Sequence, residues 1–190
     1  LIWSCMITLK NKYDKLSDSV FRFKNDIDSN EWMSVIEKTS LASYPFLKVN
    51  RRPHLTMELP TLYNKSDDIN AINLRSAFFE KIMPAISIYM QDNNISNMFP
   101  KKTFITVSKL YPGSPMVLHK DNHYKDSNHL IAMMYINDNF NGGELHIVKE
   151  GIKYKPKAGD IVIYKGNMEH EVLECDAPRY SIGYGLTDVL

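Results

Sequence analysis

The sequence predicts a mainly β protein with supporting helices, built around a jelly-roll core, also called a double-stranded β-helix. From residue 102 onward the chain consists of short β-rich runs separated by turn residues, which is typical of an all-β sandwich or barrel. Eight such runs suit a jelly roll, whose two Greek keys enclose a ligand cavity. The expected strands are residues 103–110, 116–118, 130–136, 144–148, 152–154, 160–164, 171–173 and 179–184.

The N-terminal half predicts the supporting elements. Alternation over residues 17–23 indicates a strand, and Asn30 can cap a helix over residues 31–40. Three prolines between residues 43 and 63 predict an extended or looped segment. A second helical pattern begins near Asp68, and Pro84 should kink or divide that helix. We expect the helices to cover one sheet of the jelly roll.

Composition points to one domain. The chain has 190 residues, of which 44% are hydrophobic and 24% charged, and its formal net charge is +1. We therefore expect residues 1–190 to form a single domain, with 1–101 as N-terminal support and 102–190 as the jelly-roll core. A nearly neutral chain offers no electrostatic footprint for nucleic acid or for an anionic membrane surface. Peptides and small molecules are thus favoured as partners over polyanions.

Two absences bear on the expected location. Residues 1–9 are apolar but have neither a basic region nor a small-residue cleavage site, so we expect no signal peptide. The apolar runs are shorter than the roughly 20 residues that span a bilayer. Cys5 and Cys175 lie far apart without a CxxC motif, which excludes a structural zinc knot or a dense disulfide framework. These features predict a soluble protein of a reducing compartment, the cytoplasm.

Four residues in the C-terminal half carry the chemistry. His119 and Asp121 are two positions apart, so on a strand end both side chains can chelate one cation. His170 follows in a later strand, and two imidazoles with one carboxylate form the facial triad of non-haem Fe(II) enzymes. Arg179 stands nine residues after His170 on the last expected strand. A buried guanidinium needs an anionic partner, which a carboxylate satisfies.

This order of residues resembles the 2-oxoglutarate- and Fe(II)-dependent oxygenases, whose core is a cupin-like double-stranded β-helix. Among them it is most similar to prolyl hydroxylases, including the oxygen-sensing enzymes that act on hypoxia-inducible factor. The resemblance extends over about residues 103–186. It is carried by Tyr111-Pro112-Gly113, His119-Lys120-Asp121-Asn122, Met134-Tyr135-Ile136-Asn137, Gly142-Gly143-Glu144-Leu145, His170-Glu171-Val172 and Arg179-Tyr180-Ser181-Ile182.

The resemblance implies a role for each matching residue. His119, Asp121 and His170 would bind Fe(II) and make up the catalytic centre. Arg179 would bind the distal carboxylate of 2-oxoglutarate, with further contacts from Tyr111, Tyr135 and Ser181. The resemblance also implies O2 as cosubstrate and ascorbate as an added reductant.

The implied reaction is hydroxylation of a C–H bond, with succinate and CO2 as coproducts. The similarity to prolyl hydroxylases favours a peptidyl proline as the substrate. The residues themselves leave open the same chemistry on a free amino acid, another small molecule or an alkylated nucleobase. A third hypothesis is a non-enzymatic jelly-roll module that binds a metal or a carboxylate. Succinate formation that depends on Fe(II) would separate the enzyme from such a module.

The remaining histidines and glycines receive structural interpretations. His123 and His129 lie in or beside a polar loop and are expected to be solvated or to face the substrate. His54 and His146 are expected to be structural or surface residues. Gly142 and Gly143 are expected to form a hairpin turn that requires a positive φ angle.

Overall fold

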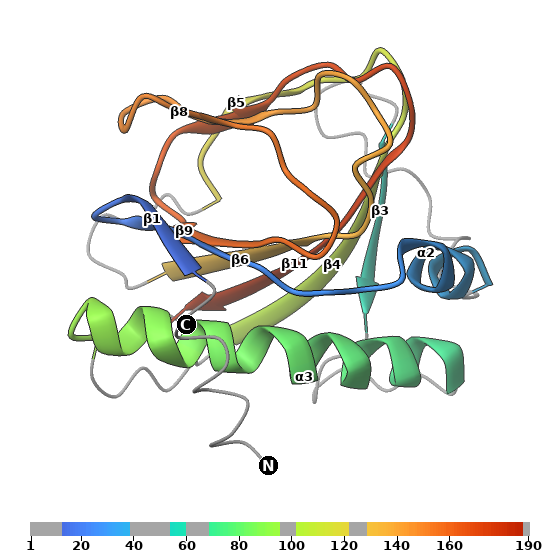
Figure 1. The fold of residues 1–190 in the computed structure, drawn as a ribbon, viewed down its shortest axis with the longest axis horizontal. Helices are drawn as coiled ribbons and strands as arrows, with labels where there is room; N and C mark the ends of the chain where they lie inside the picture. The colour runs from blue at the N-terminus through green and yellow to red at the C-terminus, as the bar shows by residue number, and fades with distance from the viewer. Residues whose placement is uncertain (1–12, 39–53, 60–68, 96–101, 122–128, 188–190) are drawn as a thin grey trace.

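Two antiparallel sheets form the protein, and they lie one above the other with the long helix α3 outside the larger sheet (Figure 1). The computed structural model describes residues 13–38, 54–59, 69–95, 102–121 and 129–187. The larger sheet has seven strands in the order β1-β2-β9-β6-β11-β4-β3, and the smaller has four in the order β5-β10-β7-β8. The predicted mainly β, jelly-roll fold class is confirmed.

All eight strands expected after residue 102 are present, and no end differs from the expected one by more than three residues. They are β4 (Lys102–Leu110), β5 (Met116–His119), β6 (His129–Tyr135), β7 (Leu145–Ile147), β8 (Ile152–Tyr154), β9 (Ile161–Lys165), β10 (His170–Val172) and β11 (Arg179–Thr187). Each is a short β-rich run bounded by turn residues, and that pattern predicted them.

The N-terminal half differs from expectation in its details. The strand expected over 17–23 is a hairpin of β1 (Tyr13–Ser17) and β2 (Val20–Phe23), because residues 18 and 19 form a turn. Within the segment expected to be extended or looped lies β3 (His54–Leu59), which pairs with β4. Its neighbours on either side fall outside the described residues.

The helices also begin and continue differently from the prediction. Helix α2 (Ser29–Lys38) is capped by Asp28 rather than by Asn30. The Asp28 carboxylate accepts hydrogen bonds from the main-chain N–H groups of Asn30 and Glu31. Helix α3 (Ile69–Asp92) passes through Pro84 as one helix. Its apolar positions before and after Pro84 are buried in the core, and that packing offsets the lost hydrogen bond. No helix in the described segments is long and apolar enough to cross a membrane.

Alternation along the larger sheet separates two environments. On β11, Tyr180, Ile182 and Tyr184 belong to the apolar core that the sheet shares with the helices. Arg179 and Ser181, offset by one position, therefore face the space between the two sheets. On β6 and β9, Tyr135 and Tyr164 belong to this second, inner cluster. The polar residues of the jelly-roll interior thus arise from the same strands that build the hydrophobic core.

An ion pair ties α2 to the larger sheet directly behind Arg179. Glu37 on α2 accepts hydrogen bonds from Lys109 Nζ at 2.6 Å and from the Tyr180 hydroxyl at 2.5 Å. Lys109 and Tyr180 are themselves cross-strand partners on β4 and β11. These hydrogen bonds from Lys109 and Tyr180 lower the pKa of the Glu37 carboxyl.

We expect Glu37→Gln to reduce the pH dependence of stability in acid. Because the native pKa of Glu37 lies below its usual value of 4.5, the unfolded chain takes up this proton first, and the stabilisation disappears as the pH falls below 4.5. The wild type should therefore exceed Glu37→Gln in urea-unfolding free energy at pH 7, and the difference should shrink toward pH 3.5. Lys109→Met should weaken the same pH dependence. A difference that stays constant with pH would contradict this role.

Candidate metal centre and adjoining anion pocket

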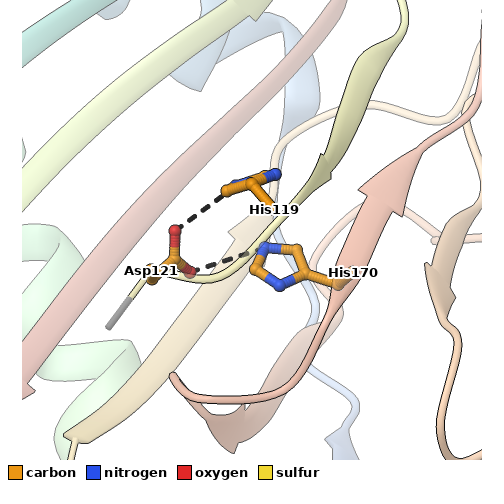
Figure 2. A group of neighbouring side chains, drawn as sticks. All are labelled: His119, Asp121 and His170. Atoms are coloured by element: carbon orange, nitrogen blue, oxygen red, sulfur yellow. Dashed lines mark ion pairs between the residues drawn. The ribbon is translucent and has the colours of Figure 1, made fainter. Parts of the chain in front are cut away.

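Three side chains with metal-binding atoms converge at one end of the smaller sheet. His119 ends β5, His170 begins β10, and the two are direct cross-strand partners. Asp121 lies two residues beyond the end of β5 and reaches back toward both rings (Figure 2). One potential ligand atom from each residue lies within 4.8 Å of the others. The structure thus brings together the three residues that the sequence spacing selected.

The carboxylate of Asp121 faces both imidazoles. Its Oδ1 lies 3.4 Å from His119 Nε2, and its Oδ2 lies 3.5 Å from His170 Nε2. The ring centroids of the two histidines are 4.3 Å apart. Two nitrogens and one carboxylate in this arrangement fit a first-row divalent metal and leave coordination positions for other ligands.

Main-chain carbonyls fix both imidazoles in the tautomer that a metal requires. His119 Nδ1 lies 2.7 Å from the Val117 carbonyl oxygen, and His170 Nδ1 lies 3.0 Å from that of Met168. Because a carbonyl only accepts, each Nδ1 carries the proton and each Nε2 presents its lone pair toward Asp121. Such outer contacts orient the ligands of metal sites.

The electrostatics favour the metal-binding protonation states. Burial lowers the pKa of His170, with the nearby Asp121 opposing this effect, so its imidazole tends to be neutral. Burial acts against the ionisation of Asp121, but its hydrogen bond with His119 and the charge of His170 outweigh burial and lower its pKa. A neutral imidazole and an ionised carboxylate are the forms that bind metals.

Arg179 lies in the jelly-roll interior near these groups. It is 2% exposed, and its guanidinium carbon lies 4.9 Å from the centre of the Tyr135 ring. The guanidinium thus stacks over the Tyr135 ring as a cation–π contact. Burial lowers the pKa of Arg179, and no carboxylate among the described residues forms an ion pair with it. Because an unpaired buried charge costs free energy, an anionic ligand that pairs with Arg179 would be stabilised here.

Ser181 extends the polar pocket along the same face of β11. Its side chain is 1% exposed, and its hydroxyl has no hydrogen-bond partner in the described part of the chain. The Nε atom of Arg179 is also without such a partner. In register, Ser181 pairs with Tyr135 on β6. Arg179 and Ser181, both selected from the sequence, therefore each carry a buried donor without an acceptor among the described residues, and Tyr135 lies beside them.

Tyr111 is placed differently. Its ring lies 5.5 Å from Lys109 Nζ, the ammonium group that binds Glu37 on the helix side of the sheet. This contact places the Tyr111 ring beside Lys109, and the role of Tyr111 in ligand binding stays a prediction.

Other expectations about the surroundings are corrected in part. His129 is not solvated: it is 7% exposed at the start of β6. His123 lies outside the described residues, as does the side chain of His54. His146 on β7 lies 2.8 Å from Glu171 on the neighbouring strand β10 of the smaller sheet, in agreement with a structural or surface role.

The two glycines have the expected positive φ angles, 71° for Gly142 and 69° for Gly143, but they form no hairpin. They lie between β6 of the larger sheet and β7 of the smaller, so they serve a crossover between sheets. A Cβ on Gly143 would lie 3.2 Å from Arg179 Cδ and 2.8 Å from the Phe140 ring. The sharp crossover therefore forms part of the wall around Arg179.

We expect Gly142→Ala to destabilise the protein more than Gly151→Ala. Both glycines have a positive φ, which costs an L-residue about 1–2 kcal/mol. A Cβ on Gly142 would also collide with the Glu174 carbonyl, whereas one on Gly151 meets nothing within 4 Å. Chemical denaturation of both variants measures the difference. Equal losses would show that the crossover can relax.

Sequence reasoning missed one residue of this interior, Tyr164 on β9. Its hydroxyl lies 3.2 Å from His170 Nε2, and its ring meets the imidazole edge to face at a centroid distance of 5.0 Å. The strand was expected, and alternation separates Tyr164 from Ile161 and Ile163, which face the helices. The sequence did not show which face of that strand lines the interior.

Comparison with known proteins agrees with this geometry. Residues 105–184 match the sequence model of the 2OG-Fe(II) oxygenase superfamily. This part of the chain, 80 of the 190 residues, carries the sequence pattern of that superfamily. The match spans β4 to β11 and includes His119, Asp121, His170 and Arg179. The match and the triad together support a dioxygenase that depends on Fe(II), 2-oxoglutarate and O2.

Solved structures of prolyl hydroxylases share the fold. A Trichoplax adhaerens prolyl hydroxylase, in complex with a peptide fragment of the hypoxia-inducible factor oxygen degradation domain, matches with a TM-score of 0.67 and 18% identity over 98% of this chain and 90% of that chain. A Pseudomonas putida prolyl-4-hydroxylase matches with a TM-score of 0.61 and 15% identity over 97% of each chain. The viral collagen prolyl hydroxylase of Paramecium Bursaria Chlorella virus-1, in its 2OG complex, gives 0.59 and 13% over 89% and 95%. No curated protein sequence matches significantly.

Proposed function

We propose that His119, Asp121 and His170 bind the Fe(II) ion of this oxygenase. The support is the convergence of two Nε2 lone pairs and one carboxylate, with both rings held by main-chain carbonyls. Three protein ligands on one side of an octahedral ion leave the opposite side for cosubstrate and oxygen. The three residues are thus the catalytic centre of the proposal.

In this proposal Arg179 binds the distal carboxylate of 2-oxoglutarate. The observation that carries it is the buried guanidinium, 2% exposed, whose Nε lacks an acceptor among the described residues. A carboxylate would accept hydrogen bonds from the N–H groups of the guanidinium and from the hydroxyl of Ser181. Tyr135 would complete the pocket, since its ring lies against Arg179 and would orient the guanidinium.

The chain's residues then divide the work of catalysis. When bound, Fe(II), 2-oxoglutarate and O2 supply the oxidation of a C–H bond to C–OH, with succinate and CO2 as coproducts. His119, Asp121 and His170 hold one end of the cosubstrate site, and Arg179 holds the other. The inner apolar cluster that includes Ile131 and Val162 keeps water from this chamber.

We further propose that the substrate is a peptidyl proline. The centre is partly open, with 32% of the His119 side chain and 26% of the Asp121 side chain accessible. On the adjoining edge strand β5, Val117 and Leu118 are 39% and 50% exposed and could contact a peptide. The structural neighbours include a prolyl hydroxylase solved with its peptide. The near-neutral charge also suits a peptide better than a nucleic acid.

The direct test supplies purified protein with Fe(II), 2-oxoglutarate, O2 and ascorbate, together with a panel of proline-containing peptides. Mass spectrometry should show one added oxygen atom on proline and an equal amount of succinate. The same panel should contain free amino acids, small acids and alkylated nucleobases. Oxygen added only to one of these would replace the peptide substrate while keeping the chemistry. Absence of 2-oxoglutarate binding by the metal-loaded protein would overturn the oxygenase proposal itself.

Tyr111 can be tested in the same assay. We expect Tyr135→Phe to weaken 2-oxoglutarate binding, because Tyr135 contacts Arg179. Tyr111→Phe should do so only if the Tyr111 hydroxyl reaches the cosubstrate when it binds. Calorimetric titration of both variants, loaded with Mn(II), distinguishes these cases.

A further inference from the structure

Tyr164 is the buried polar residue of the interior that the proposed iron and cosubstrate sites do not yet use. It lies on β9, is 2% exposed, and belongs to the inner apolar cluster. Its hydroxyl can donate one hydrogen bond into this interior.

In the metal-free protein the Tyr164 hydroxyl donates to His170 Nε2, an acceptor that metal binding would remove. The hydroxyl lies 3.2 Å from His170 Nε2. Since His170 Nδ1 donates to the Met168 carbonyl, Nε2 is the acceptor and Tyr164 the donor. The same Nε2 lone pair faces Asp121 Oδ2 at 3.5 Å, where the metal would be bound. One lone pair cannot serve both a hydroxyl and a metal ion.

Metal binding therefore frees a buried hydroxyl that must find a new acceptor. Leaving a buried donor unsatisfied costs free energy, so a ligand that accepts this hydrogen bond is favoured. The Tyr164 ring contacts His170 at a centroid distance of 5.0 Å on the metal side, and Tyr164 shares the inner apolar cluster with Tyr135, which lies against Arg179. The phenol thus lies between the two ends of the proposed cosubstrate site.

We propose that the Tyr164 hydroxyl binds the cosubstrate, donating a hydrogen bond to the keto-acid end of 2-oxoglutarate once a metal occupies the triad. This inference rests on the proposed function of the site. The hydroxyl is directed toward His170 and hence toward the metal-binding end, whereas Arg179 serves the distal carboxylate. Tyr164 would therefore help select 2-oxo acids over dicarboxylates that lack the keto group.

The test uses Tyr164→Phe, which keeps the ring and removes only the hydroxyl. Protein loaded with Mn(II), which does not turn over, is titrated with 2-oxoglutarate and separately with pyruvate. Pyruvate keeps the keto-acid end and lacks the distal carboxylate. We expect Tyr164→Phe to weaken the binding of both ligands by about tenfold, the effect of one hydrogen bond to a charged group. Arg179→Met should weaken the binding of 2-oxoglutarate alone.

Metal titration provides a second readout. In Tyr164→Phe no hydroxyl competes with the metal ion for the lone pair of His170 Nε2. The Mn(II) affinity of this variant should therefore equal that of the wild type or exceed it. Weaker Mn(II) binding would overturn the proposal, because Tyr164 would then act by supporting His170. Tyr89→Phe is the matched control: it removes a buried hydroxyl that donates to the Ser19 carbonyl at 2.9 Å, and it should change neither affinity.

The remaining outcomes separate this inference from the proposed function. If the wild type with Mn(II) fails to bind 2-oxoglutarate, the proposed function is wrong. If the wild type binds it and Tyr164→Phe binds it equally well, only the role of Tyr164 is wrong. Weakened binding of 2-oxoglutarate with unchanged pyruvate binding would place the hydroxyl at the distal end and would also overturn the proposal.

Discussion

Replacing Asp121 by Ala is expected to abolish Fe(II)-dependent succinate formation and to leave the fold intact. Asp121 supplies the single carboxylate that faces both His119 Nε2 and His170 Nε2, so its loss removes one of three ligands. Changes to mere outer-shell partners cost about 10- to 100-fold in metal affinity or activity, and we expect more than about 100-fold here. The side chain lies in a loop and is 26% exposed, so its removal leaves no cavity in the core.

Asp138→Ala is the matched control for this variant. Asp138 is also a partly exposed loop aspartate, but it pairs with Lys157 at 3.9 Å, away from the triad. Circular dichroism and thermal unfolding should be near wild type for both variants, and calorimetry should show weaker Mn(II) binding only for Asp121→Ala. Near-normal turnover by Asp121→Ala would refute the ligand assignment.

Arg179→Met is expected to separate cosubstrate binding from stability. The guanidinium is buried without a carboxylate among the described residues, so a methionine of similar length removes a costly charge. We expect the unfolding free energy of the ligand-free protein to stay unchanged or to rise by about 1–2 kcal/mol. The affinity for 2-oxoglutarate should fall by about 100-fold or more, because several charge-assisted hydrogen bonds are lost.

Thermal unfolding of Mn(II)-loaded protein with and without 2-oxoglutarate measures both effects. A ligand at 100 times its Kd stabilises a protein by about 2.7 kcal/mol, so the wild type should show a clear shift that Arg179→Met lacks. Arg22→Met gives the contrast, because Arg22 pairs with Asp14 at 2.5 Å. It should lower stability and keep the 2-oxoglutarate shift. A strongly destabilised Arg179→Met that retains the shift would make Arg179 a structural residue.

The C-terminal strands were predictable because each is a short β-rich run bounded by turn residues. The N-terminal differences have local physical causes. The turn at residues 18 and 19 interrupts a run whose two halves both carry strand-forming residues. Asp28 and Asn30 are both good cap residues, and only the geometry shows that Asp28 accepts the bonds. Pro84 disfavours a helix interior, but burial of the flanking apolar residues outweighs that local preference.

The grouping of the proposed metal ligands was predictable from spacing because His119 and His170 are partners on paired strands and Asp121 lies two residues beyond His119. The anion pocket followed from an arginine on a strand of apolar residues. Tyr164 and Tyr111 could not be placed, because tyrosines suit either face of a sheet. Only the pairing of β9 with β6 shows that Tyr164 faces inward beside Ile131. The one-domain organisation, the substrate and the role of Tyr111 stay predictions.

The hydrogen bonds that orient both histidines have a consequence for how the site can vary. In each case the acceptor is the main-chain carbonyl two residues earlier, at Val117 and at Met168. Every residue type carries that carbonyl, so substitutions at 117 or 168 cannot delete it. The orientation of the two rings is therefore insulated from side-chain change at these positions. Side chains beside the proposed iron site can therefore change while the two imidazoles keep their alignment.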